Sequence, residues 1–175
     1  MTEETTTGPA PRAVLPAIRH VAIVLVTFVA VGALAGVVWE WLWTAPVGVA
    51  VRHEWVPESF ATYRGEFSGT AWYVLIATVA GLVTAVALAL ALDRSEVLTL
   101  VAVLVGSALA GWVMLLVGEA LGPLDPQTVA ATADNLTRIP DQLTVSGKSP
   151  FVAFPTGALV GLMVVFFGVT RLHRE

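Results

Sequence analysis

The sequence predicts an all-α membrane protein, in which a bundle of four transmembrane helices carries a small α/β cap outside the membrane. Two observations predict this fold. Four apolar runs, at about residues 18–43, 71–92, 97–121 and 151–170, are each long enough to cross a bilayer, which needs about 20 apolar residues. The chain is also 57% hydrophobic and only 13% charged, whereas soluble domains are about 25% charged.

The composition narrows the possible functions. A chain of 175 residues with a mean hydropathy of +0.82 has no room for a separate soluble catalytic domain beside four spans. A net charge of −4 and the lack of a Lys/Arg-rich block argue against a nucleic-acid partner. The chain has no cysteine, so disulfides and thiolate metal sites are excluded. The first expected partner is therefore the lipid bilayer.

The first apolar run is expected to stay in the protein as a transmembrane helix. Residues 18–43 are longer than the apolar region of a cleaved signal peptide, which has about 7–15 residues. Residues 1–17 are largely polar and contain proline, so we expect a disordered cytoplasmic tail there. Residues 18–175 then form the membrane domain, with external loops at residues 44–70 and 122–150.

Basic residues predict the orientation, because lysine and arginine close to the spans are retained in the cytoplasm. The two tails and the short turn near residues 93–96 are densely basic, with Arg12, Arg19, Arg94, Arg171 and Arg174. The two long loops hold basic residues at a lower density, with Arg52, Arg64, Arg138 and Lys148. Both termini are therefore expected on the cytoplasmic side of the plasma membrane.

Aromatic residues at the outer ends of the first two spans support this orientation. Tryptophan and tyrosine prefer the headgroup level of a bilayer, where one end of the ring is apolar and the other is wet. We therefore expect five interfacial anchors, Trp39, Trp41, Trp43, Trp72 and Tyr73.

Small residues predict how the spans pack. In lipid, helices associate through close approach of small side chains rather than through the hydrophobic effect. The expected packing residues are Gly32, Gly36, Gly81, Gly106, Ser107, Gly111, Gly157 and Gly161. Packing within one bundle is the first interpretation, and homodimerisation through one of these faces is the alternative. A weak repeat between residues 32–36 and 107–111 fits two parallel helical hairpins.

The first external loop is expected to supply strands to the cap. Val47, Val49 and Val51 alternate with small or polar residues, which is the period of a half-buried strand. A second extended piece is expected at residues 59–63. Neither loop can bury a core alone, so the cap is expected to need both loops.

The second external loop is expected to supply a helix and a strand. Asp125 followed by Pro126 predicts a helix N-terminus, and the helix is expected to end near Leu136. Residues 142–145 are expected to form a strand. On the opposite side of the membrane, Ser95 is expected to cap the third span.

Two carboxylates, Glu40 and Glu119, are the only acidic side chains inside the apolar runs. A charge in the bilayer is costly and marks function by default. Both residues lie near the outer ends of their spans, where contact with headgroups or water is the simpler interpretation. The functional interpretation is a paired outer site for a cation, a proton or an arginine, with Arg52 and Arg64 as the candidates.

The sequence contains no constellation typical of an enzyme. His53 and Glu54 lack the second histidine that a zinc-protease helix needs, so no metal site is expected. No nucleophile is followed by a base at the usual spacing. We therefore expect a protein that is not an enzyme, with no catalytic residue, no metal and no cofactor.

Four short motifs resemble an uncharacterised family of small four-pass membrane proteins of high-GC Gram-positive bacteria, a domain of unknown function. They lie at residues 39–46 (Trp-Glu-Trp-Leu-Trp-Thr-Ala-Pro), 66–82, 106–123 and 154–159 (Phe-Pro-Thr-Gly-Ala-Leu). The similarity covers most of the chain after residue 18. It implies four spans and a plasma-membrane location, and it implies no activity, ligand or catalytic residue.

These observations leave two functional hypotheses. The first is a non-enzymatic accessory or scaffolding protein of the cell envelope, which contacts another membrane protein or a second copy of itself. The alternative is a small transporter or ion-coupled protein that uses Glu40 and Glu119. The arrangement of the two carboxylates distinguishes them, because transport requires that both face one polar cavity.

Overall fold

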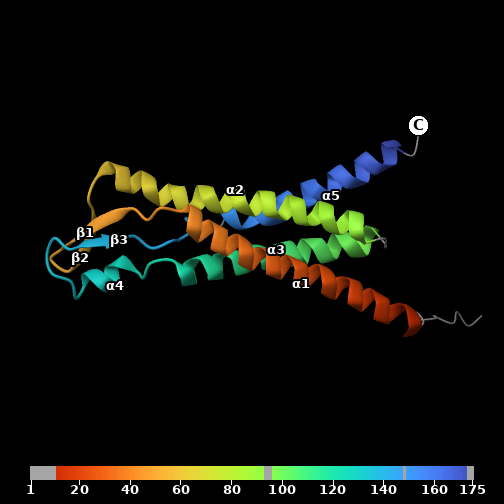
Figure 1. Ribbon diagram of the computed structural model, residues 1–175, viewed down its shortest axis with the longest axis horizontal. Helices are drawn as coiled ribbons and strands as arrows, with labels where there is room; N and C mark the ends of the chain where they lie inside the picture. Colours follow the sequence, from red (N-terminus) through yellow and green to blue (C-terminus); the bar gives the residue numbers. More distant parts are fainter. Residues whose placement is uncertain (1–10, 93–95, 148, 173–175) are drawn as a thin grey trace, which may run out of the picture.

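The computed structural model describes residues 11–92, 96–147 and 149–172 (Figure 1). Of the described residues, 73% are helical. Its elements are α1 (Pro11–Leu42), β1 (Val47–Val51), β2 (Glu54–Pro57), α2 (Phe60–Ala91), α3 (Glu96–Leu121), α4 (Pro126–Ala130), β3 (Arg138–Pro140), the 3-10 helix η1 (Ser149–Val152) and α5 (Ala153–Leu172). Within the described residues, four helices, α1, α2, α3 and α5, are long and apolar enough to cross a membrane.

The molecule is elongated, with the four long helices side by side (Figure 1). The three strands and α4 lie together at one end, which we call the sheet end. The start of α1 and the end of α5 lie at the other end, the terminus end, where these two helices point away from each other.

The four helices form two parallel pairs. α1 packs mainly against α3, and α2 packs mainly against α5, whereas α2 and α3 touch little although they are adjacent in the chain. Gly32 lies against Ala110, and one turn further on Gly36 lies against Met114, so α1 and α3 run in the same direction. Two helical hairpins, α1–α2 and α3–α5, therefore stand side by side in parallel.

The core lies between the pairs and extends into the sheet end. Its largest buried side chains include Trp39, Tyr73, Phe28 and Phe154, and the rings of Phe28 and Phe154 meet edge to face at 6.2 Å. Leu143, from the segment between β3 and η1, is also buried in this core. The sheet end is thus attached to the helices by packing as well as by the chain.

The sheet has the order β2-β1-β3, and both pairings are antiparallel. The strand predicted at Val47–Val51 is present, but the valines do not form its buried face. Gly48 and Ala50 are buried instead. The indole ring of Trp55 lies directly over Gly48, and Ala50 packs with Ala130 and Ile139. Because Trp55 and α4 lie so close to β1, only small side chains fit on the buried face of this strand.

The extended piece predicted at residues 59–63 is wrong, because α2 begins at Phe60. The first connecting loop therefore ends near residue 59 rather than at residue 70. Gly65 and Gly69 both lie inside α2. A Cβ on Gly65 would overlap the ring of Pro46, so the glycine permits close packing. Ser59 has the extended backbone of a residue that precedes a helix.

The helix predicted from Asp125 to Leu136 is shorter than expected. Asp125 caps it as predicted, with its carboxylate accepting the N–H of Gln127 at 3.0 Å, but α4 ends at Ala130. The following backbone instead joins β1. Leu136 donates its N–H to the carbonyl of Ala50 at 2.8 Å, and Thr137 accepts from the N–H of Ala50 at 2.9 Å.

Two further boundaries differ from the predictions. The strand expected at residues 142–145 is absent from the described chain, because this segment turns Leu143 into the core instead of pairing with a neighbouring strand. Residues 11–17 of the expected disordered tail are helical. Pro11 lies in the first turn, where its missing N–H would have no partner, and Pro16 lies inside the helix. Residues 1–10 and the predicted cap Ser95 lie outside the described residues.

Candidate functional site

The five aromatic residues expected as interfacial anchors fall into two groups. Trp41 is 77% exposed, and Trp72 also reaches the surface. Trp39, Trp43 and Tyr73 are buried, so the prediction that these three anchor at a headgroup layer is corrected. Large aromatic rings occur both in the packed core between helices and at the membrane surface, and the sequence alone does not distinguish these two environments.

Trp39 joins α1 to α2, and Tyr73 joins α2 to α3, each through a hydrogen bond to a backbone carbonyl. The indole Nε1–H of Trp39 donates to the carbonyl of Gly69 at 2.8 Å, and the hydroxyl of Tyr73 donates to the carbonyl of Gly111 at 2.8 Å. Their rings meet edge to face at 5.2 Å. Both polar atoms are therefore satisfied, which buried groups require.

The small residues expected at helix contacts lie against neighbouring helices of the same chain. A Cβ would come within 3.0 Å of a backbone atom of the facing helix at five of them, Gly32, Gly36, Gly81, Gly157 and Gly161. Gly106 lies against the ring of Phe28, and Gly111 lies near the hydroxyl of Tyr73. Ser107 is buried and donates to the carbonyl of Leu104 at 3.0 Å. These faces are occupied within one molecule.

Glu40 and Glu119 lie at the same level of the parallel α1–α3 pair, because Trp39 packs directly over Gly118. Glu40 is half-buried and Glu119 is exposed. Within the part of the chain that the structure describes, neither carboxylate forms an ion pair or accepts a hydrogen bond. The packing thus brings the two backbones together without joining the two carboxylates in a polar site.

The two arginines proposed as partners lie elsewhere. Arg52 is in the two-residue turn between β1 and β2, one strand length away from the end of α1. Its side chain is exposed, and its backbone N–H donates to the amide oxygen of Asn135 at 2.8 Å. The side chain of Arg64 lies outside the described residues. The ion pair described at the sheet end joins Arg138 to Glu58 at 2.7 Å, and both side chains are exposed.

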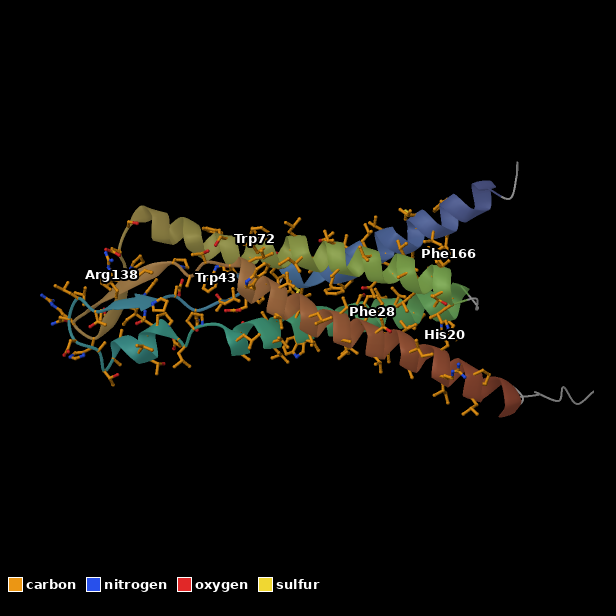
Figure 2. All side chains as sticks on the ribbon, in the orientation of Figure 1. His20, Phe28, Trp43, Trp72, Arg138 and Phe166 are labelled. Atoms are coloured by element: carbon orange, nitrogen blue, oxygen red, sulfur yellow. The ribbon has the colours of Figure 1, made fainter. Side chains whose placement is uncertain are left out.

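A polar pocket of about 210 Å³ lies where α1 and α2 meet the segment after β3. It is lined by Trp43, Gly69, Asp141, Gln142, Thr144 and Ser146. Figure 2 shows Trp43 at this junction, between the end of α1 and the strands. Trp43 is only 9% exposed, and its buried Nε1–H has no hydrogen-bond partner among the described protein atoms.

Asp141 is the charged group of this pocket. Its backbone N–H donates to the carbonyl of Pro46 at 2.8 Å, and its carboxylate accepts the N–H of Gln142 at 2.8 Å. Burial raises the pKa of Asp141 above its usual value. The hydrogen bond from Gln142 opposes this shift in the pKa, and repulsion from Asp125 adds to it. The carboxylate is thus held in a fixed position at the pocket wall.

A second polar contact lies at the terminus end, where Figure 2 labels His20. His20 and Thr99 are both 3% exposed, and the Nε2 atom of His20 is 3.1 Å from the hydroxyl of Thr99. A hollow of about 360 Å³ beside them is lined partly by Arg19 and Leu92. His20 had no predicted contact, because a single histidine near a helix end carries no pattern.

The described chain combines four helices that are long and apolar enough to cross a membrane with a small sheet, which by length and composition fits the class of multi-pass membrane proteins. Comparison of the chain with protein-family models, with curated proteins and with solved structures finds no match. The resemblance to a family of four-pass proteins of high-GC Gram-positive bacteria therefore stays a prediction.

Proposed function

We propose that the protein is a non-enzymatic accessory or scaffolding component of the cell envelope, which crosses the plasma membrane four times and presents the sheet end to a partner outside the cell. In this proposal the terminus end faces the cytoplasm, as the density of basic residues indicates. The observation that carries the proposal is that the small-residue faces of the helices are covered by the protein's own helices. Because these helix faces are already covered, we assign partner binding to the sheet end.

The tip of the sheet end has features that suit recognition. Arg52 and His53 form the hairpin turn with φ angles of 54° and 68°, a conformation in which glycine and asparagine are usual. Such residues cost about 1–3 kcal/mol each and cluster at functional sites. The exposed apolar residue Leu136, whose φ is also positive, lies on the segment that pairs with β1. Exposed cationic and apolar groups together fit a protein partner.

Ion-coupled transport, the alternative, has weaker support. It requires Glu40 and Glu119 to share one polar site, and Glu119 is exposed without a described partner. The buried polar residues described in the helices, which include His20, Thr84, Thr99 and Ser107, are few, and His20 and Thr99 contact each other at 3.1 Å. This pattern suits packing better than a pathway for ions.

Site-specific photocrosslinking in native membranes tests the proposal. A photoreactive amino acid replaces Leu136, which is 75% exposed at the sheet end, and in a matched control it replaces Leu34, which is 66% exposed on α1. We expect a discrete protein adduct from position 136, identifiable as an envelope protein or a second copy of this chain, and lipid adducts from position 34. Protein adducts from position 34 alone, or from neither position, would contradict the proposal.

A further inference from the structure

We propose that the polar pocket between α1, α2 and the segment after β3 binds neighbouring hydroxyl groups of a polyol, either a free sugar or the polyhydroxyl headgroup of a lipid. The pocket contributes no contact to the scaffolding surface proposed above, so the inference goes beyond that function. The inference rests on the hydrogen-bonding groups that line the pocket and on the contacts that fix their positions.

The first argument is the buried donor of Trp43. An indole N–H can only donate, and a buried donor without a partner destabilises the folded protein. Trp39, one turn earlier in the chain, is satisfied by the carbonyl of Gly69. A Cβ on Gly69 would lie 3.4 Å from Nε1 of Trp43, so the same glycine also leaves space open in front of the second indole. An acceptor atom from a ligand would complete this site.

The second argument is the set of acceptors across the pocket. Asp141 can only accept when ionised, whereas the side chains of Gln142, Thr144 and Ser146 can both donate and accept. The six lining residues include no lysine, arginine or histidine, which disfavours phosphate and other anions. A pair of adjacent hydroxyls matches this lining, since one hydroxyl can accept from Trp43 while its neighbour donates to Asp141.

The size and rigidity of the pocket fit a small polyol. Its volume of about 210 Å³ equals that of roughly seven water molecules at about 30 Å³ each, enough for a glycerol or one sugar ring. The walls are fixed before a ligand arrives, because Ser146 donates its N–H to the hydroxyl of Thr70 at 2.9 Å and Leu143 anchors the segment in the core. A preformed site loses little conformational entropy on binding.

The test follows the indole N–H resonances of the full-length protein in lipid nanodiscs by NMR. The six tryptophans give separate indole signals, and the signal of Trp43 is assigned by its loss in Trp43→Phe. One arm titrates glucose and glycerol into phosphatidylcholine discs. A second arm replaces phosphatidylcholine with phosphatidylglycerol, and a third uses phosphatidylethanolamine. We expect a saturable shift of the Trp43 signal in the first or second arm, with the Trp39 signal unchanged.

Variants assign the effect to the pocket. Gly69→Ala places a methyl group in front of Trp43 and is expected to weaken polyol binding at least tenfold, read from the amide signals of residues 142–146. Gly168→Ala, with no atom within 4 Å of the added methyl, is expected to leave binding unchanged. Trp43→Phe is expected to weaken binding as Gly69→Ala does, whereas Trp41→Phe, a change at an exposed residue, is not.

Each outcome decides the question. A shift with free glucose or glycerol identifies a soluble ligand, and a shift only with phosphatidylglycerol identifies a lipid headgroup. A shift with phosphatidylethanolamine alone would overturn the proposal in favour of an ammonium group at Asp141. No shift in any arm would overturn it as well, leaving a pocket that holds water only. Crosslinking from position 136 does not depend on any of these results, so the two proposals fail separately.

Discussion

Two tryptophans one turn apart, Trp39 in α1 and Trp43 directly after it, allow the value of a single buried hydrogen bond to be measured. We predict that Trp39→Phe destabilises the protein more than Trp43→Phe does, although both changes remove the same atoms. Trp39 is fully buried and donates to the carbonyl of Gly69 at 2.8 Å, whereas the Nε1–H of Trp43 has no described partner.

The magnitude follows from the two hydrogen-bond contributions. Trp39→Phe loses a bond that contributes about 0.5–1.5 kcal/mol, and Trp43→Phe removes an unsatisfied donor that costs about 1–3 kcal/mol. The loss of packing is common to both variants, so it largely cancels in the comparison. We therefore expect a difference of about 1.5–4.5 kcal/mol in the free energy of unfolding.

The assay is reversible unfolding in mixed micelles, with no sugar or glycerol present, followed by circular dichroism. Trp41→Phe is the matched control, because this side chain is 77% exposed on the same helix and its change is expected to stay within about 0.5 kcal/mol. Equal destabilisation by Trp39→Phe and Trp43→Phe, or greater destabilisation by Trp43→Phe, would refute the reasoning.

Three other predictions follow from the described contacts. Gly157→Ala forces a methyl group onto the carbonyl of Thr78 and is expected to cost about 1–3 kcal/mol in the same unfolding assay, whereas Gly168→Ala is neutral. His53→Gly relieves a residue with φ of 68° and is expected to raise stability by up to about 1 kcal/mol; a loss of stability would show that the imidazole makes a favourable contact. Because the pKa of Asp141 is raised, the folded state keeps the carboxyl proton to a higher pH than the unfolded state does. The free energy of unfolding therefore falls as the pH rises through the folded-state pKa. Asp141→Asn is expected to flatten the profile of stability against pH in this range.

The long elements were predictable because the bilayer imposes a simple rule on sequence. A span needs about 20 apolar residues, and α3 and α5 begin and end within a few residues of the predicted runs. The beginnings of α1 and α2 were not predictable by the same rule. Both helices continue into polar sequence, where composition no longer distinguishes a helix from a loop.

The sheet end was predictable in strand β1 and in the cap of α4, but not in its other two strands or in its contacts. Asp125 and Pro126 carry a local signal for a helix start, and that start is present. The end of α4 depends on hydrogen bonds between Leu136 and Ala50, which are far apart in the sequence. Pairings of this kind leave no local pattern.

The candidate site residues could likewise be selected from the local sequence, but their contacts depend on residues that are distant in the chain. Glu40 and Glu119 were selected because charges in apolar runs are rare, but the facing of a side chain depends on helix rotation. The pocket around Trp43 and Asp141 was not predicted at all. Its residues come from three separate segments, and each is ordinary by itself. An unsatisfied indole N–H becomes visible only when its neighbours are placed.

The central claim is that the sheet end lies outside the cell and the terminus end lies in the cytoplasm. The chain has no cysteine, so single cysteines can be introduced without a background signal. Thr132→Cys places a thiol in the exposed turn after α4, and Thr6→Cys places one near the N-terminus. A membrane-impermeant maleimide applied to intact cells is predicted to label position 132 and to reach position 6 only after permeabilisation. Labelling of position 6 in intact cells, with position 132 protected, would contradict the account.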